Sequence, residues 1–300
     1  MRAAVLHEVN GSLTVEELPE PEGDAVVDVR AAGVNFADLL IRRGVYPQMP
    51  DLPFVPGSEV AGDLDGRPVL ALTRASGGGY AERVAVDTSW TFPLPEGASY
   101  AAGAGFLLTY LTAYIPLHRQ LRVTPVSTVL VHAGAGGVGC AAVQLAKNLG
   151  ARVIATASSA DKRAVARDNG ADEAISYDEL DGVRADVVID PVGGEVFTRS
   201  LPLLNPLGAI VAVGFAGGLW EDPSVQWLVG RNASVVGFYL GRLMRHDAGF
   251  VRECALELLG MWTSGEIDPV IGAQFPLEDA DRAHELIAER RHWGKVVLEP

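Results

Sequence analysis

Glycine residues that follow a short apolar run are the first chemically informative feature of the sequence. Residues 132–139 read His-Ala-Gly-Ala-Gly-Gly-Val-Gly, so Gly134, Gly136 and Gly139 have the spacing G-x-G-x-x-G, and a helical segment closed by Gly150 follows. Glycine permits a tight turn and a close backbone approach to a diphosphate, and a helix N-terminus offers unpaired N–H groups. The pattern predicts a dinucleotide site. The residues expected to form it are Gly134, Ala135, Gly136, Gly137, Val138 and Gly139.

The end of the next expected strand, 152–156, distinguishes between the two nicotinamide dinucleotides. A site that prefers NAD has an acidic residue about 20 residues beyond the loop, where it binds the adenine ribose. Here the strand is followed by Ser158 and Ser159, and a cation, Lys162 or Arg163, follows within one helical turn. These hydroxyls and this cation suit a 2′-phosphate, so we expect NADP(H). Ser159 also fits the N-cap of the following helix and Lys162 a solvated charge, and both roles are compatible with phosphate binding.

The order of apolar segments predicts the fold class. Apolar runs alternate with helical segments between residues 128 and 239, which indicates a parallel sheet covered by helices on both faces. Short runs bounded by Gly and Pro before about residue 110 indicate an irregular β-rich domain. A closing strand at 294–298 needs a sheet to join, and the N-terminal domain is the simplest choice. We therefore expect an α/β protein with a substrate domain over 1–112, a dinucleotide domain over 113–246 and a return to the first domain over 247–300.

Composition excludes several classes of function. The 300 residues have a net charge of -14, which disfavours binding to nucleic acid. No apolar run approaches the roughly 20 residues of a membrane span, and Glu8 interrupts the N-terminus too early for a secretory signal, so we expect a cytoplasmic protein. Cys140 and Cys254 are too few for a thiolate metal site or a disulfide framework, and we expect them to be buried and reduced. His132 is expected to form local hydrogen bonds.

Further motifs extend over nearly the whole chain. They are Ala32–Asp38, Arg43–Pro47, Pro56–Gly62, Tyr110–Tyr114, His132–Gly139, Asp190–Gly194 and Gly294–Leu298. In these motifs and their order the chain resembles the zinc-independent, zeta-crystallin-like quinone oxidoreductases of the medium-chain dehydrogenase/reductase superfamily. The resemblance implies a Rossmann domain, with a doubly wound parallel sheet, inserted into a β-rich GroES-like substrate domain.

Comparison with the zinc alcohol dehydrogenases of that superfamily argues against a metal. Those enzymes have Cys where this chain has Asn35 and His where it has Ser58, and they have four further cysteines that this chain lacks. Asn and Ser are poor zinc ligands, and the neighbouring Glu59 cannot hold zinc alone. We expect no metal and therefore a hydride transfer to an already polarised acceptor, a quinone or an alkene conjugated to a carbonyl.

The resemblance also implies roles for individual residues. Asn35 would lie near the nicotinamide and bind cofactor or substrate through its amide. Tyr46 matches a proton donor of similar enoyl-thioester reductases, although its position before Pro47 also suits a pocket wall. Further residues are expected to contact the cofactor, namely Thr112, Tyr177, Val192, Gly214, Phe215, Ala216, Phe238 and Lys295.

Three functions are compatible with these residues. The first is NADPH-dependent reduction of a quinone or other conjugated carbonyl compound. The second is reduction of an enoyl thioester, because Ala31–Phe36 also resembles the enoyl-reductase domains of polyketide synthases. The third is a non-catalytic structural or sensor protein that binds NADPH, since some relatives are lens crystallins. The resemblance further implies a homodimer formed through the last strand of the Rossmann sheet, near 234–239.

Overall fold

The computed structural model describes residues 1–73 and 77–300, which form two compact units. The terminal unit comprises Met1–Leu108 and Asp268–Pro300, and the central unit comprises Thr109–Ile267. The second junction therefore lies beyond residue 246, the boundary that the sequence predicted. The reason is that helix α9 (Ala248–Thr263) is tied to the start of the central unit, where Tyr114 and Arg119 both bond to Glu257.

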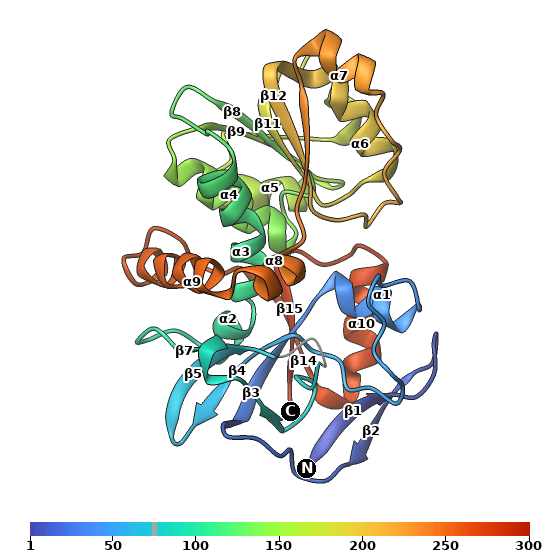
Figure 1. Cartoon of the computed structure of the whole chain (residues 1–300), viewed down its shortest axis with the longest axis vertical. Coiled ribbons are helices and arrows are strands. Elements are labelled where there is room, and N and C mark those ends of the chain that lie inside the picture. The colour runs from blue at the N-terminus through green and yellow to red at the C-terminus, as the bar shows by residue number, and fades with distance from the viewer. Residues whose placement is uncertain (74–76) are drawn as a thin grey trace. The chain divides into compact units, whose positions relative to one another are not determined.

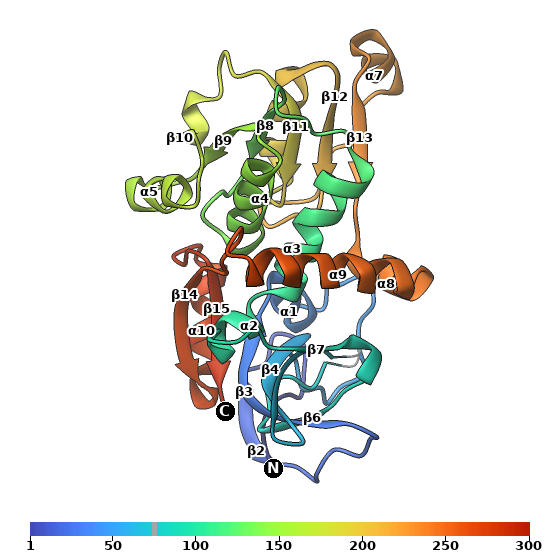
Figure 2. The same ribbon diagram turned by 90° about the vertical axis from the view of Figure 1, so that its left-hand side faces the viewer.

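The central unit contains a six-stranded sheet in the order β10-β9-β8-β11-β12-β13 (Figure 2). All five strand pairs are parallel. The strands are β8 (Thr128–Val131), β9 (Arg152–Thr156), β10 (Glu173–Ile175), β11 (Ala185–Asp190), β12 (Leu204–Ala212) and β13 (Ser234–Gly237). The chain starts at β8 in the middle, builds outward to β10 and then returns to β11. This confirms the expected doubly wound sheet, whose reversal between β8 and β11 creates the crevice that typically binds a ligand.

Helices cover this sheet because its strands are apolar on both faces. Phe197 of α6 (Gly194–Ser200) packs in one apolar cluster with Leu130, Ile154 and Ile210, while α4 (Gly137–Asn148) contacts β8 and β9. The other helical elements of this part are α5 (Ala160–Asp168), η3 (Tyr177–Glu179), η4 (Leu201–Leu203), α7 (Val225–Arg231) and α8 (Leu240–His246). Helix α3 (Leu107–Tyr114) and η2 (Ile115–Gln120) precede β8.

The terminal unit is built on a mixed sheet in the order β14-β15-β3-β4-β5-β7, with β6 also paired to β3. Its strands are β3 (Val26–Val34), β4 (Glu59–Leu64), β5 (Arg67–Leu72), β6 (Arg83–Ala85), β7 (Thr91–Pro93), β14 (Ile271–Pro276) and β15 (Lys295–Glu299). Strand β15 runs antiparallel to β3, with Val296 opposite Val34. This pairing confirms that the closing strand joins the sheet of the N-terminal domain.

Short helices and a hairpin complete the terminal unit (Figure 1). The hairpin is β1 (Arg2–Leu6) with β2 (Leu13–Glu17), and the helical elements are α1 (Phe36–Arg42), η1 (Thr88–Trp90), α2 (Tyr100–Ala104), η5 (Leu277–Asp279) and α10 (Ala280–Ala288). Apolar residues of β1, β3 and α10 share one buried core with Tyr80. No helix in the described ranges has the length and hydropathy required to traverse a bilayer.

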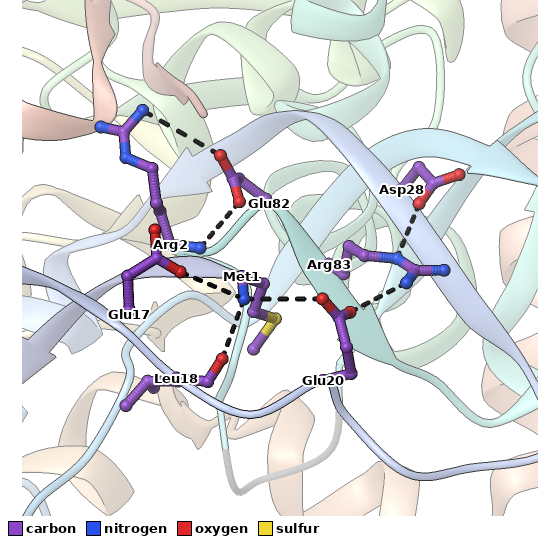
Figure 3. Close-up of polar contacts among 8 residues, drawn as sticks. All are labelled: Met1, Arg2, Glu17, Leu18, Glu20, Asp28, Glu82 and Arg83. Atoms are coloured by element: carbon purple, nitrogen blue, oxygen red, sulfur yellow. Dashed lines mark hydrogen bonds and ion pairs between the residues drawn. The ribbon is translucent and has the colours of Figure 1, made fainter.

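Polar contacts join the first residues of the hairpin to the sheet (Figure 3). The Met1 ammonium donates to the carbonyl oxygen of Leu18 at 2.8 Å and lies 3.5 Å from the carboxylates of Glu17 and Glu20. Arg83 of β6 bonds to Glu20 and to Asp28 of β3, each at 2.8 Å. Ion pairs at an exposed surface contribute little to stability, so the apolar core carries most of the stability of this region.

Candidate functional site

The glycine loop lies where the sequence placed it, between β8 and α4. Gly136 is the N-cap of α4, and the Gly134 amide donates to the carbonyl oxygen of Thr156 at 2.9 Å. A Cβ at Gly134 would lie 2.6 Å from Cβ of Ala155, and one at Gly139 would overlap the carbonyl oxygen of Ala133. Only glycine fits at either position, because an added Cβ would collide with β9 or with the loop itself, and the first turn of α4 leaves backbone N–H groups without helical partners, as the predicted diphosphate site requires.

His132, at the start of this loop, belongs to a buried hydrogen-bond network that holds the loop in place. Its Nδ1 is 2.9 Å from Oγ1 of Thr156, and its Nε2 is 2.6 Å from Oγ of Ser200. Ser200 donates its own proton to the carbonyl oxygen of Val196, so His132 must donate from Nε2 and accept at Nδ1. Burial lowers the pKa of His132 to about 3, which keeps the ring neutral in this tautomer. The expectation of local hydrogen bonding holds, and His132 is a support for the loop.

Tyr177 lies against the same loop. Its hydroxyl accepts the Ala133 amide at 3.1 Å, and its ring stacks on His132 with centroids 5.9 Å apart. Arg199 donates to the carbonyl oxygen of Tyr177 at 2.8 Å. Ala133 has a positive φ of 49°, and the bond from Tyr177 holds this uncommon conformation. Tyr177 therefore shapes the glycine loop, and its expected contact with the adenosine phosphate stays a prediction.

The predicted 2′-phosphate residues lie at the end of β9. Ser158 and Ser159 are both exposed, and Ser159 caps α5 by accepting the Lys162 amide at 3.3 Å. The capping role that the sequence left open is therefore present. Arg163 is a second cation at this place. Its Nη1 donates to the carbonyl oxygen of Ala157 at 3.4 Å, so its guanidinium lies beside the end of β9. No carboxylate follows Thr156 before α5 begins at Ala160.

Two loops at the ends of β11 and β12 hold each other. Oδ1 of the buried Asp190 accepts the amides of Val192 and Gly193 at 2.8 and 2.9 Å, and Gly217 donates to the carbonyl oxygen of Val192 at 2.6 Å. Burial raises the pKa of the Asp190 carboxyl group. Ala216 donates to the carbonyl oxygen of Pro191 at 3.3 Å. The predicted segment Gly214–Ala216 is therefore fixed against Val192, and the Ala216 amide is already used in its hydrogen bond to Pro191.

A cavity of about 750 Å³ lies in the central unit beside the ends of β12 and β13. Its lining includes five aromatic side chains, namely Phe197, Trp220, Phe238, Tyr239 and Phe250. The amide of the predicted residue Phe238 donates to the carbonyl oxygen of Ala212 at 3.1 Å, so its backbone N–H is used within the sheet while the residue lines the cavity. The predicted Thr112 is a half-buried residue of α3 in the same unit. An aromatic cavity of this size suits a planar apolar molecule.

The terminal unit brings Asn35, Glu59 and Lys295 into direct contact. Lys295 places Nζ 2.7 Å from Oδ1 of Asn35 and 2.7 Å from Oε1 of Glu59. Both charged side chains are buried, Lys295 with 4% and Glu59 with 1% of its surface exposed. Tyr46, the other predicted residue of this unit, is half-buried in the loop after α1. The pairing of Lys295 with Glu59 was not evident from the sequence, because the two residues are 236 positions apart.

Asp38 completes the surroundings of Asn35. Its Oδ2 accepts a hydrogen bond from the backbone N–H of Asn35 at 2.8 Å, as part of the N-terminal cap of α1. The same oxygen also accepts a hydrogen bond from the Tyr80 hydroxyl. Tyr80 in turn lies 3.2 Å from Nε2 of His284. Burial raises the pKa of Asp38 to about 6 and lowers that of His284 to about 3. This buried chain was missed from the sequence, although Asp38 three residues after Asn35 has the spacing of a capping box.

The residues at the expected zinc position do not suit a metal. Asn35 offers an amide oxygen and Ser58 a hydroxyl, which are weak zinc ligands. The Lys295 ammonium already lies against the Asn35 oxygen and against Glu59, so a divalent cation on these atoms would meet a like charge. Among residues 1–73 and 77–300, no group of three or more His, Cys, Asp or Glu side chains could hold a metal ion.

Comparisons with known proteins match both units. A family model described as zinc-binding dehydrogenase matches residues 137–256, and one described as alcohol dehydrogenase GroES-like domain matches residues 21–66. A curated relative from Nematostella vectensis, named quinone oxidoreductase-like protein 2 homolog, is 34% identical over 323 residues, covering 99% of this chain and 88% of the relative.

Solved structures agree over the full length. The quinone oxidoreductase from Thermus thermophilus, described alone and in complex with NADPH, has a TM-score of 0.92 and 41% identity, with 100% of both chains covered. The Escherichia coli quinone oxidoreductase complexed with NADPH has a TM-score of 0.87 and 30% identity, covering 100% of this chain and 99% of the other.

Proposed function

Because this chain belongs to the quinone oxidoreductase family of the medium-chain dehydrogenase/reductase superfamily, we propose that it is a metal-free, NADPH-dependent reductase of quinones or other conjugated carbonyl compounds. The observation that carries the proposal is the cluster of Asn35, Glu59 and Lys295, which places an amide and an ammonium where zinc relatives have a metal. Without a Lewis acid, an alcohol lacks its activator, whereas a quinone or enone accepts a hydride directly.

The residues of the central unit would hold the cofactor. The first turn of α4 and the loop Gly134–Gly139 bind the diphosphate, and Ser158, Ser159 and Lys162 with Arg163 bind the 2′-phosphate. Thr112, Val192, Gly214–Ala216 and Phe238 border the nicotinamide, and Tyr177 keeps the glycine loop in place. The bound NADPH supplies a hydride from its nicotinamide ring. The Asn35 amide, held by Lys295, is the proposed contribution of the terminal unit to binding of cofactor or acceptor.

The acceptor would bind in part through the aromatic cavity beside β12 and β13. The aromatic part of its lining fits the ring of a quinone or the conjugated chain of an enone. A quinone needs no acid from the protein, since solvent protonates the hydroquinone anion. An enone needs a proton on carbon, for which Tyr46 is the candidate donor. Tyr46→Phe should therefore slow enone reduction and leave quinone reduction unchanged. Turnover of both acceptors that is unchanged by Tyr46→Phe would assign Tyr46 to the pocket wall.

Cofactor preference gives an independent test. Since the 2′-phosphate is the only difference between the dinucleotides, Ser158→Asp should weaken NADPH binding by about tenfold or more through charge repulsion, equivalent to about 1.4 kcal/mol. NADH binding should change by less than about threefold. Ser158→Ala is the matched control, and fluorescence titration measures both affinities. Tighter binding of NADH than of NADPH by the unmodified protein would refute the NADP(H) assignment.

The decisive experiment measures NADPH oxidation against quinones, enones and enoyl thioesters. We expect turnover with quinones or enones. Activity confined to enoyl thioesters would make the protein an enoyl reductase, and NADPH binding without any turnover would make it a structural or sensor protein. Cys140 and Cys254 are buried thiols, which are compatible with the proposed reducing, cytoplasmic location.

A second copy of the chain is the proposed partner. Strand β13 is the last strand in the order of its sheet, and apolar side chains near it are exposed, including Leu219, Val225 and Val229. An unpaired edge with exposed apolar neighbours is a liability that pairing with an identical strand removes.

A further inference from the structure

The Lys295 ammonium has an acceptor for each of its three protons. Nζ donates to Oδ1 of Asn35 at 2.7 Å, to Oε1 of Glu59 at 2.7 Å and to the carbonyl oxygen of Val34 at 3.2 Å. An ammonium group has three donors and no acceptor. In this arrangement Lys295 has no proton left for a ligand, so any effect it has on cofactor or acceptor must pass through Asn35 or Glu59.

These contacts determine which way the Asn35 amide points. An ammonium can only donate and an ionised carboxylate can only accept, so Oδ1 must face Lys295 and Nδ2 must face Glu59, which lies 3.2 Å away. The opposite amide orientation would place NH₂ against the ammonium and oxygen against the carboxylate. A remaining contact joins Nδ2 to the carbonyl oxygen of Gly33 at 3.4 Å, which is long for a hydrogen bond. This weakly held proton is the one that a ligand can recruit.

The surrounding backbone keeps the three side chains in place. Oε2 of Glu59 accepts the Leu108 amide at 3.0 Å, so both carboxylate oxygens are held. Gly33 leaves the necessary room, because a Cβ there would lie 2.7 Å from Oε1 of Glu59. The Asn35 backbone is fixed separately through its bond to Asp38. The amide is therefore oriented by the protein before any ligand arrives.

We infer that Lys295 and Glu59 are positioning residues that make the Asn35 amide a polarised hydrogen-bond donor for the acceptor oxygen that gains charge during hydride transfer. A cation on the amide oxygen draws electron density from the nitrogen and strengthens its N–H as a donor. A donor that is oriented in advance stabilises developing negative charge without reorganisation. The inference rests on the proposed function, in which the hydride, with its two electrons, comes from NADPH and the final proton comes from solvent or Tyr46.

This arrangement predicts a dependence on the acceptor. A weakly electrophilic enone needs help from a donor on its carbonyl oxygen, whereas a strongly electrophilic quinone needs little. Loss of the polarised amide should therefore slow hydride transfer to enones far more than to quinones. A side chain that only stabilises the fold would lower both rates by the same factor.

The test variant is the double substitution Lys295→Met with Glu59→Gln, because Lys295→Met alone leaves a buried carboxylate unpaired and risks unfolding. Asn35→Ala is measured beside it, and Lys295→Arg tests rescue of the cation. Lys147→Met with Asp172→Asn removes a lysine–carboxylate pair of the central unit, 2.9 Å apart, and is the matched control. NADPH affinity and thermal unfolding establish that each variant is folded and loaded.

Single-turnover oxidation of NADPH is followed with one enone and one quinone. We expect the double variant and Asn35→Ala to lose about 100-fold in the enone rate, as for removal of one transition-state donor, and less than about fivefold in the quinone rate. The control should keep both rates. Equal losses for both acceptors, or no loss for either, would overturn the inference and leave the proposed function intact. Failure of the unmodified protein to reduce any acceptor would instead refute the proposed function, and the inference with it.

Discussion

The Tyr80 hydroxyl lies 3.1 Å from Oδ2 of Asp38, the same oxygen that caps the backbone of Asn35. Both side chains are buried, and the Tyr80 hydroxyl also contacts His284. Asp38 is therefore a charge buried beneath the proposed donor. Burial raises its pKa to about 6, partly opposed by its hydrogen bonds and by the nearby Lys295, and raises the pKa of Tyr80 as well.

Asp38 should make the protein less stable as the pH rises. Its pKa is higher in the folded state than the ordinary value of 3.8, so its contribution is fully present below that value and is lost as the pH rises through about 6. Asp38→Asn retains an acceptor for the backbone N–H of Asn35 and cannot ionise. From pH 4 to pH 7.5, its free energy of unfolding relative to the unmodified protein should rise by about 2.5 kcal/mol, measured by urea denaturation. A difference that stays constant over this range would contradict a buried, titrating Asp38.

His132 should have the opposite pH dependence. Burial lowers its pKa from 6.5 to about 3, so its contribution to stability is present above pH 6.5 and is lost as the pH falls through that range. Each histidine of this kind lowers the free energy of unfolding by about 1.4 kcal/mol for each pH unit below 6.5. His132→Gln keeps a hydrogen-bonding side chain without a titrating ring, so the acid slope of its unfolding free energy should be shallower by about one proton. His284 remains as an internal comparison, since its pKa is lowered in the same way. An unchanged slope would show that His132 is accessible to protons in the folded state.

The sequence predicted the elements and the cofactor loop well, because their signals are local. The G-x-G-x-x-G spacing and the strand before it are contiguous, and Gly134 and Gly139 have a steric reason visible in the structure, such as the overlap of a Cβ at Gly139 with the carbonyl oxygen of Ala133. The boundary beyond α9 was not predictable, because it depends on Glu257 meeting Tyr114 and Arg119 across more than a hundred residues. The Asn35–Glu59–Lys295 cluster escaped for the same reason. Each residue stood out in its own motif, and the closing strand was expected to join the N-terminal sheet, but no local pattern states that β15 pairs with β3 in that sheet.

The glycine loop gives a steric prediction with a matched control. Gly139→Ala would force its Cβ into the backbone oxygen of Ala133, which cannot move without distorting the loop. We expect a stability loss of about 1–3 kcal/mol and a loss of NADPH affinity of at least about tenfold. Gly260→Ala is the control, because Gly260 lies within α9 and an added Cβ would have no neighbour within 4 Å. It should raise stability by up to about 1 kcal/mol and leave NADPH affinity unchanged, as thermal unfolding and fluorescence titration will show.

The edge of β13 tests the proposed homodimer. The Phe238 amide donates to Ala212 of β12, and alternate residues of a strand face the same neighbour. The amides of Val235 and Gly237 are therefore directed away from β12, toward the free edge. Val235→Pro removes one outward donor while sparing the bonds to β12, and proline is tolerated on edge strands.

We expect Val235→Pro to shift a dimer to a monomer while NADPH binding persists, with Val235→Thr as the control that keeps the amide and the branched side chain. Sedimentation velocity at micromolar concentration measures the mass directly. A dimer that survives Val235→Pro would exclude pairing through β13, because an antiparallel copy needs this row of donors. A monomeric unmodified protein would instead show that the exposed residues Leu219, Val225 and Val229 are not covered by a second copy of the chain.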